Sequence, residues 1–156
     1  MAAKIGISEK NLKASADILK IVLADEFVLY TKTRNYHWNV ESASFMELHK
    51  LFEGQYEALD EIVDSVAERI RTLGHYSLGT LKEFLATTRL TEKGDATTAK
   101  KMIANLLADH EDIATFLRKA IDETGNKYGD AGTSDFLTGL LKEHEKTAWF
   151  LRSYLK

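Results

Sequence analysis

The stretch NYHWNVESASFMELHKLFEGQYEALDEIVDSVAERIRTLG, from Asn35 to Gly74, decides the fold of this chain. In its second part an apolar side chain returns every seven positions, at Phe45, Phe52, Leu59, Val66 and Leu73. This spacing predicts a long helix with one face in a core. Ser44 and Glu47 have the spacing of a capping box, and Gly74 is a natural helix stop. A helix from Ser44 to Gly74 is therefore expected.

The same periodicity predicts three further long helices and one short helix. They are expected at about residues 8–37, 80–86 and 95–123, and from Thr133 or Ser134 onward. The connection between the second and third long helices has about 20 residues, enough to cross a bundle and let these two helices run parallel. The expected fold is all-α: a ferritin-like four-helix bundle whose long crossover carries a short helix.

Composition limits the class of protein. The 156 residues, of which 44% are apolar, suit one domain spanning residues 1–156. With no cysteine, the chain can form neither disulfides nor thiolate metal sites, which fits a cytoplasmic protein. No secretory signal is evident at the start and no apolar run is long enough to span a membrane. The net charge of −3 gives no general attraction to nucleic acid.

A line of metal-binding residue types borders the core face of the second helix. With His49 at zero on a helical wheel, Asp60 falls at about 20°, Glu53 at about 40°, Asp64 at about 60° and Glu68 at about 100°. The apolar line lies at about −40° to −80°. Imidazole and carboxylate ligands together suit Fe(II) and similar divalent metals. An ordinary solvated or salt-bridged face is the alternative interpretation.

The spacing of these residues also predicts how a metal site is completed. His49 and Asp64 lie ~22 Å apart along a helix, too far to bind one metal within a single chain. The pair His49 and Glu53 and the pair Asp64 and Glu68 are placed symmetrically about a point between residues 58 and 59. A two-fold axis at that point would bring one pair against the other pair of a second subunit, making two equivalent sites in a dimer.

A conventional di-iron site inside one bundle is not expected. Such sites use Glu-x-x-His pairs on facing helices. None of the five histidines has a glutamate three residues before it.

Several segments together resemble the Dps-like miniferritins. They are NYHWNVESASFMELHKLFE, DEIVDSVAERIRTLG and GTLKEFL, and the likeness extends to EKTAWFLRSYL near the end. The resemblance implies a hollow shell of twelve subunits built from two-fold dimers. It also implies ferroxidase activity, with Fe(II) oxidised between two-fold-related subunits and ferric mineral stored inside.

The resemblance also assigns the site residues. It implies that His37, His49 and Glu53 of one subunit, with Asp64 and Glu68 of the other, hold two iron ions per site. Many members have aspartate in place of Glu53; either acid can bind iron. The family prefers hydrogen peroxide as oxidant, because it accepts two electrons and so avoids the hydroxyl radical.

Three aromatic or imidazole side chains have alternative interpretations. A helix-capping or buried structural histidine is the alternative for His37, which spacing alone does not connect with the metal line. Trp38 follows it and, by resemblance, lies near the iron, where it could give up an electron; a packing aromatic is the alternative. His75 is expected to shape a turn in the crossover, with an extra metal ligand as the alternative.

Polar residues of the last two helices are given structural roles. Residues 109–112 are expected to form a solvated surface cluster. The resemblance implies an acidic pore as the alternative, for which Asp112 and Asp122 are the candidates. His144 is expected at the surface of the last helix and Trp149 in its core.

DNA compaction is the main alternative function. In the Dps-like family it rests on a mobile tail rich in lysine and arginine. Here the N-terminal region offers only Lys4, Lys10 and Lys13, and the chain ends at Lys156 directly after a helix. With a negative net charge, DNA binding is expected to be weak. A third hypothesis is a purely structural bundle whose acidic stripe forms a salt-bridged dimer contact.

Overall fold

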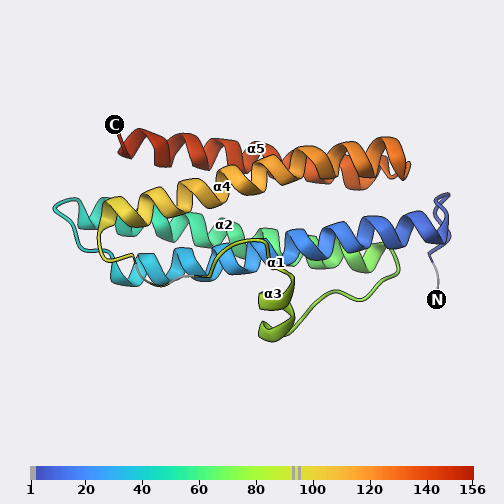
Figure 1. The fold of residues 1–156 in the computed structure, drawn as a ribbon, viewed down its shortest axis with the longest axis horizontal. Coiled ribbons are helices and arrows are strands. Elements are labelled where there is room, and N and C mark those ends of the chain that lie inside the picture. Colours follow the sequence, from blue (N-terminus) through green and yellow to red (C-terminus); the bar gives the residue numbers. More distant parts are fainter. Residues whose placement is uncertain (1–2, 93, 95) are drawn as a thin grey trace.

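The computed structural model describes residues 3–92, 94 and 96–156, and the regular elements in this part of the chain are all helical. They are α1 (Glu9–Asn39), α2 (Phe45–Thr72), α3 (Leu81–Thr87), α4 (Ala99–Asp122), the π-helical turn η1 (Glu123–Lys127) and α5 (Ala131–Tyr154). Figure 1 shows the four long helices side by side and α3 outside them. The predicted all-α bundle with a short helix in the crossover is confirmed.

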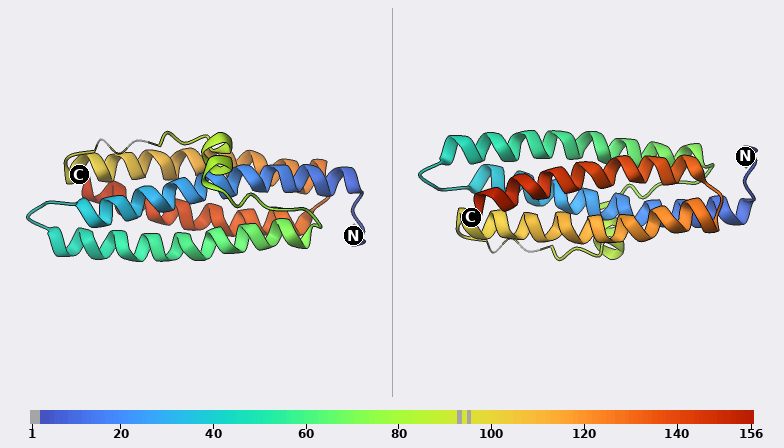
Figure 2. Two further views of the ribbon diagram at one scale, coloured as in Figure 1. Left: turned by 90° about the horizontal axis from the view of Figure 1, so that it is seen from below. Right: turned by 90° about the horizontal axis from the view of Figure 1, so that it is seen from above.

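The bundle consists of two antiparallel hairpins, α1 with α2 and α4 with α5 (Figure 1). The crossover leaves the end of α2, carries α3 past the middle of α1 and returns to the start of α4. As a result α2 and α4 run parallel, as the length of this connection predicted. In Figure 2, seen from above, α5 lies between α2 and α4.

Most of the predicted apolar positions are buried. On α2 the side chains of Phe52, Leu59, Val66 and Leu73 all lie in the core. Two predicted core residues do not: Phe45 is 42% exposed and Trp149 is 58% exposed. They lie in the first turn of α2 and near the end of α5, which are at the same end of the bundle.

The predicted capping box at the start of α2 is wrong. Ser44 is the N-cap residue, but its side chain makes no capping hydrogen bond within the described part of the chain. Glu47 is used elsewhere, since Tyr154 donates a hydrogen bond from its hydroxyl to Glu47 Oε1 over 2.5 Å. That bond raises the pKa of Tyr154 to about 12. A capping box does open α3, where Thr80 and Glu83 bond reciprocally.

Two other helix starts differ from the prediction. Helix α4 begins at Ala99, with Thr98 as its cap, and the expected start at Asp95 lies outside the described residues. Helix α5 is capped by Asp130, because its carboxylate accepts from the backbone and hydroxyl of Thr133 and from Arg69 of α2. Thr133 is therefore the third residue of that helix, not its cap.

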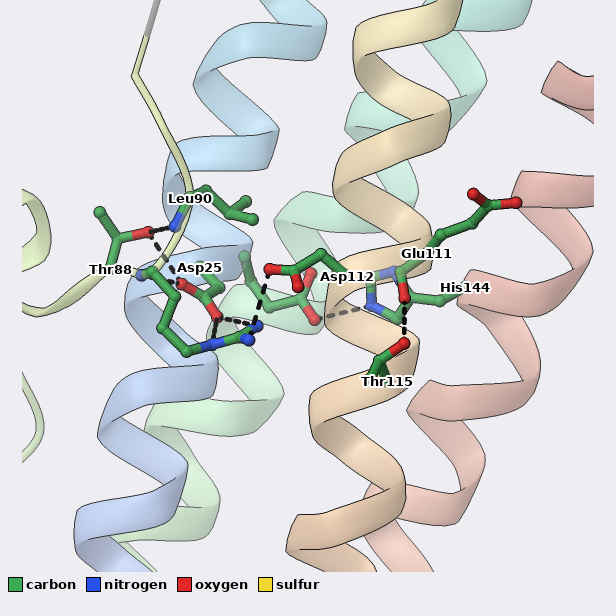
Figure 3. Close-up of polar contacts among 9 residues, drawn as sticks. Asp25, Thr88, Leu90, Glu111, Asp112, Thr115 and His144 are labelled. Carbon is green, nitrogen blue, oxygen red and sulfur yellow. Dashed lines mark hydrogen bonds and ion pairs between the residues drawn. The ribbon is translucent and has the colours of Figure 1, made fainter.

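A buried carboxylate fastens the crossover to α1 (Figure 3). Asp25 is fully buried and accepts hydrogen bonds from the Thr88 hydroxyl at 2.8 Å and the Arg89 backbone N–H at 2.7 Å. The Arg89 guanidinium also binds it, through Nε at 2.8 Å and Nη2 at 2.7 Å. The crossover thus ends in a fixed position beside the bundle.

Residues 109–112 do not form the expected solvated cluster. Asp109 binds buried Lys32 at 2.5 Å, and burial raises the pKa of Asp109 although Lys32 opposes this. Lys32 also donates to the Thr91 carbonyl, so this pair is a second anchor for the crossover. His110 is only 2% exposed, whereas Asp112 stays half exposed. Asp109 and His110 therefore face the interior of the bundle, whereas Asp112 remains at the surface.

A chain of three buried titratable groups crosses the bundle. His144 is buried, contrary to its expected place at the surface, and its Nε2 lies 2.8 Å from Glu26 Oε1. Its Nδ1 lies 2.9 Å from His110 Nδ1. Glu26, His144 and His110 come from α1, α5 and α4. The partners on two other helices are what make the inward position of His144 favourable.

We expect the buried Glu26–His144–His110 chain to make the free energy of unfolding depend on pH. Burial, and then the neighbouring His144, hold the pKa of His110 well below 6.5. In the unfolded chain His110 takes up a proton near pH ~6.5, so the unfolded state binds more protons below that pH. The free energy of unfolding should therefore be unaffected above this pH and fall by up to ~1.4 kcal/mol per pH unit below it.

Urea unfolding between about pH 7 and pH 5 measures this slope. His110→Leu should flatten it, whereas His75→Ala, at the far end of α2, should leave it unchanged. Equal slopes for the wild type and His110→Leu would contradict the assignment to His110.

Candidate functional site

Two histidines that are twelve residues apart in sequence meet where α1 turns into α2. His37 lies in the last turns of α1 and His49 in the second turn of α2. Their rings are stacked, with centroids 3.8 Å apart and planes inclined by 22°. The centroid of the Phe45 ring lies 5.1 Å from that of the His49 ring, with the two planes inclined by 30°.

The hydrogen bonds of the two rings are reciprocal. Nδ1 of His37 lies 2.9 Å from the His49 carbonyl oxygen, and Nδ1 of His49 lies 2.9 Å from the His37 carbonyl oxygen. A carbonyl oxygen only accepts, so each Nδ1 carries a hydrogen and donates it. In the neutral rings both Nε2 atoms then keep a lone pair for a metal. This is the usual outer-shell arrangement of metal-binding histidines.

Glu53 follows His49 by one helical turn. Lys50 donates a hydrogen bond to Glu53 Oε2 over 2.5 Å. This bond lowers the pKa of Glu53, and the nearby His37 and His49 add to the effect. The carboxylate therefore stays ionised beside the two imidazoles, as a metal ligand must.

A cation and three aromatic rings lie next to the histidines. The Tyr56 ring meets His37 edge-on at 5.2 Å. The Arg34 guanidinium lies 4.8 Å from the Tyr56 ring centroid, 5.5 Å from that of Tyr30 and 5.2 Å from that of Trp38. Trp38 itself is 65% exposed, so it is not a core aromatic. Sequence reasoning missed Arg34, although Tyr30, Arg34 and Trp38 recur at helical spacing.

The two remaining predicted ligands lie elsewhere on the same chain. Asp64 and Glu68 are exposed on α2, well beyond Glu53 along the helix axis. One subunit therefore has His37 and His49 in contact and Glu53 nearby, whereas Asp64 and Glu68 lie elsewhere. In residues 3–92, 94 and 96–156 no three acidic or histidine side chains are arranged to hold a metal ion within one chain.

Comparison with known proteins agrees with the fold. The pattern of the ferritin-like domain matches residues 16–156. A crystal structure of a Dps protein from Vibrio cholerae, described as a member of a broad superfamily of ferritin-like diiron-carboxylate proteins, superposes with a TM-score of 0.93 at 30% identity. The superposition covers 99% of this chain and 97% of that one.

Two relatives are similar in sequence over most of their length. An uncharacterised low temperature-induced protein from Nostoc is 44% identical over 97% of this chain and 86% of its own. DNA protection during starvation protein 2 from Bacillus anthracis is 36% identical over 92% of this chain and 97% of its own.

The bundle, its crossover and these matches define a ferritin-like protein of the iron-storage and DNA-protection kind. The chain belongs to the ferritin-like family and, within it, to the Dps-like miniferritins. Membership in a diiron-carboxylate superfamily implies that iron is the metal it binds. Of the helices in the described residues, none is both long and apolar enough to cross a membrane.

Proposed function

We propose that this protein is a cytoplasmic ferroxidase and iron store. It oxidises Fe(II), preferentially with hydrogen peroxide, and keeps the ferric mineral inside a hollow shell of twelve subunits, which protects against oxidative damage. The observation that carries the proposal is the histidine pair, because mutual Nδ1 hydrogen bonds leave both Nε2 atoms of His37 and His49 as ligands.

Each ligand has a physical role in holding two iron ions per site. Neutral imidazoles of His37 and His49 bind Fe(II) without adding negative charge. Glu53, with Asp64 and Glu68 of the partner subunit, balances the positive charge that grows when iron becomes ferric. Trp38 beside this site is the proposed one-electron donor for a stray oxidising equivalent.

The exposure of the acids supports sharing between two-fold-related subunits. Asp60, Asp64 and Glu68 lie uncovered on α2, and no three acidic or histidine side chains of the described residues are arranged to hold a metal ion within one chain. A two-fold axis between residues 58 and 59 joins the histidine end of one α2 to the acidic end of the other. Because the operation is symmetric, each dimer gains two identical sites.

Peroxide suits a site that holds two iron ions. Two Fe(II) give up one electron each, the O–O bond of one hydrogen peroxide breaks, and two protons complete two water molecules. No odd electron is left to form a hydroxyl radical.

Anaerobic titration of the Fe(II)-loaded protein with hydrogen peroxide tests the proposal. We expect two Fe(II) oxidised per peroxide, with little spin-trapped hydroxyl radical, and slower oxidation when oxygen replaces peroxide. One Fe(II) per peroxide with abundant radical would contradict it.

DNA compaction is the second candidate function. It is suggested by the similarity to DNA protection during starvation protein 2. The charges argue against it, since the net charge is −3 and Lys13 is paired with Asp17. A gel shift at about 0.15 M salt is expected to show no stable complex.

A further inference from the structure

Arg34 lies among three aromatic rings beside the histidine pair. Its guanidinium carbon lies 4.8 Å from the ring centroid of Tyr56, 5.2 Å from that of Trp38 and 5.5 Å from that of Tyr30. The Tyr56 ring in turn contacts His37. Tyr30, Arg34 and Trp38 follow one another at intervals of four residues along α1, so they share one face of this helix. One positive charge is therefore close to three oxidisable side chains next to the proposed iron site.

The hydrogen bonds of Arg34 leave its charge beside these rings. Nη1 donates to the Tyr30 hydroxyl over 2.5 Å, whereas Nε is buried and has no hydrogen-bond partner among the described residues. A guanidinium has no acceptor atom, so it cannot take up the proton that a phenol releases when it is oxidised. Arg34 therefore does not assist Tyr30 as an electron donor.

The two tryptophans of the chain provide a comparison within the molecule. Trp38 is 65% exposed and Trp149 is 58% exposed, so solvent reaches both indole rings to a similar extent. The Trp149 ring lies against Phe150, with 4.8 Å between the centroids, and no cation lies over it in the described part of the chain. Trp149 is thus an internal reference for an indole without a nearby positive charge.

A fixed cation makes an indole ring harder to oxidise. The neutral ring attracts a cation, because the face of its π-system carries partial negative charge. Loss of one electron makes the ring positive, and the Arg34 charge 5.2 Å from the Trp38 centroid then repels it. Arg34 therefore stabilises the reduced form of Trp38 relative to its oxidised form, which raises the reduction potential of the Trp38 radical.

We propose that Arg34 is a positioning residue that acts through Trp38, because its charge sets how strong an oxidant must be to take an electron from this indole. The inference rests on the proposed role of Trp38 as one-electron donor. A strong oxidant such as the hydroxyl radical takes one electron from the ring and becomes hydroxide, and the indole N–H proton then passes to solvent. Weaker one-electron oxidants leave the ring intact, so Trp38 is not consumed while iron is oxidised in pairs.

Pulse radiolysis of the assembled, iron-free protein tests the proposal. In a Trp149→Phe background Trp38 is the only tryptophan, and its radical is brought to equilibrium with a reference redox couple. Arg34→Met should raise the equilibrium constant for oxidation of Trp38 about tenfold, because the repelling charge is gone. Arg34→Lys keeps a positive charge and should stay near the wild-type value. A change in access to the ring would alter the rate of oxidation, not this equilibrium.

The protein with both tryptophans gives a second readout. After exposure of the iron-free protein to a mild one-electron oxidant, peptide mass spectrometry should find the oxidation products mainly at Trp149. Arg34→Met should shift them toward Trp38. An unchanged distribution between the two residues in this variant would contradict the proposal.

Arg71→Met is the matched control, because the Arg71 guanidinium lies 4.3 Å from the Tyr76 ring centroid at the other end of α2 and should not affect Trp38. An unchanged equilibrium in Arg34→Met, or equal shifts in Arg34→Met and Arg34→Lys, would overturn the proposal. No iron is present in these measurements. A failure of the oxidation threshold can therefore be told apart from a failure of the proposed ferroxidase function.

Discussion

His49→Ala is expected to slow peroxide-driven iron oxidation by about a hundredfold or more. The substitution removes one Nε2 ligand. It also removes the ring that donates to the His37 carbonyl and stacks on His37, so the second ligand loses its fixed orientation. Helical content should be unchanged, because His49 is half-buried at the end of the bundle and not in its core. Stopped-flow absorbance and circular dichroism measure the two quantities.

Asp64→Ala should have a comparable effect on the rate, although Asp64 lies far from His49 on the same chain. His75→Ala is the control, since His75 lies at the other end of α2, 3.7 Å from Glu9. Wild-type rates in both His49→Ala and Asp64→Ala would mean that iron is oxidised elsewhere.

Asp25→Ala is expected to lower the free energy of unfolding by about 3 kcal/mol or more. It leaves the Thr88 hydroxyl and the Arg89 backbone N–H without their buried acceptor and removes the main partner of the guanidinium. Arg89 keeps a longer contact with Asp112, at 3.4 Å. The amide hydrogens of Thr88 to Leu90 should exchange much faster, because the crossover loses its anchor on α1.

Asp17→Ala on the same helix is the matched control. Asp17 is 46% exposed and pairs with Lys13 and Lys20 at the surface, so its loss should cost less than about 1 kcal/mol. Both variants are compared by denaturant unfolding at one protein concentration, since assembly contributes to apparent stability. An equal, small loss for Asp25→Ala and Asp17→Ala would show that the buried anchor is not needed.

The periodicity of apolar residues was enough to predict the helices and their order, and the length of the connection between α2 and α4 predicted their parallel course. Helix starts were harder because distant residues decide them. Tyr154 binds Glu47, the residue expected to complete a capping box at Ser44, and Arg69 supports Asp130 as the cap of α5. Neither partner is near in sequence to the residue that it controls.

The site was predictable only where it lies on one helix. Spacing along α2 grouped His49, Glu53, Asp64 and Glu68, but it could not reach His37, which packs onto His49 from α1. The family resemblance supplied that residue. His144 was placed at the surface because its sequence neighbours do not reveal Glu26 and His110, the partners that make its burial favourable.

The central claim is that each iron site is shared between two subunits. A complementation experiment needs two variants, one with His37 and His49 replaced by alanine and one with Asp64 and Glu68 replaced by alanine. Each variant alone lacks part of every proposed site and should be nearly inactive. In a mixed dimer one site loses all four residues, whereas the other combines the intact histidines of one subunit with the intact acids of its partner.

The measurement is ferroxidase activity after the two variants are unfolded together in equal amounts and reassembled, with co-assembly confirmed by differential labelling. Random pairing makes half of the dimers mixed, so roughly a quarter of all sites should be active. The account predicts recovery to about a quarter of the wild-type rate. Co-assembled shells with no recovered activity would contradict the shared site.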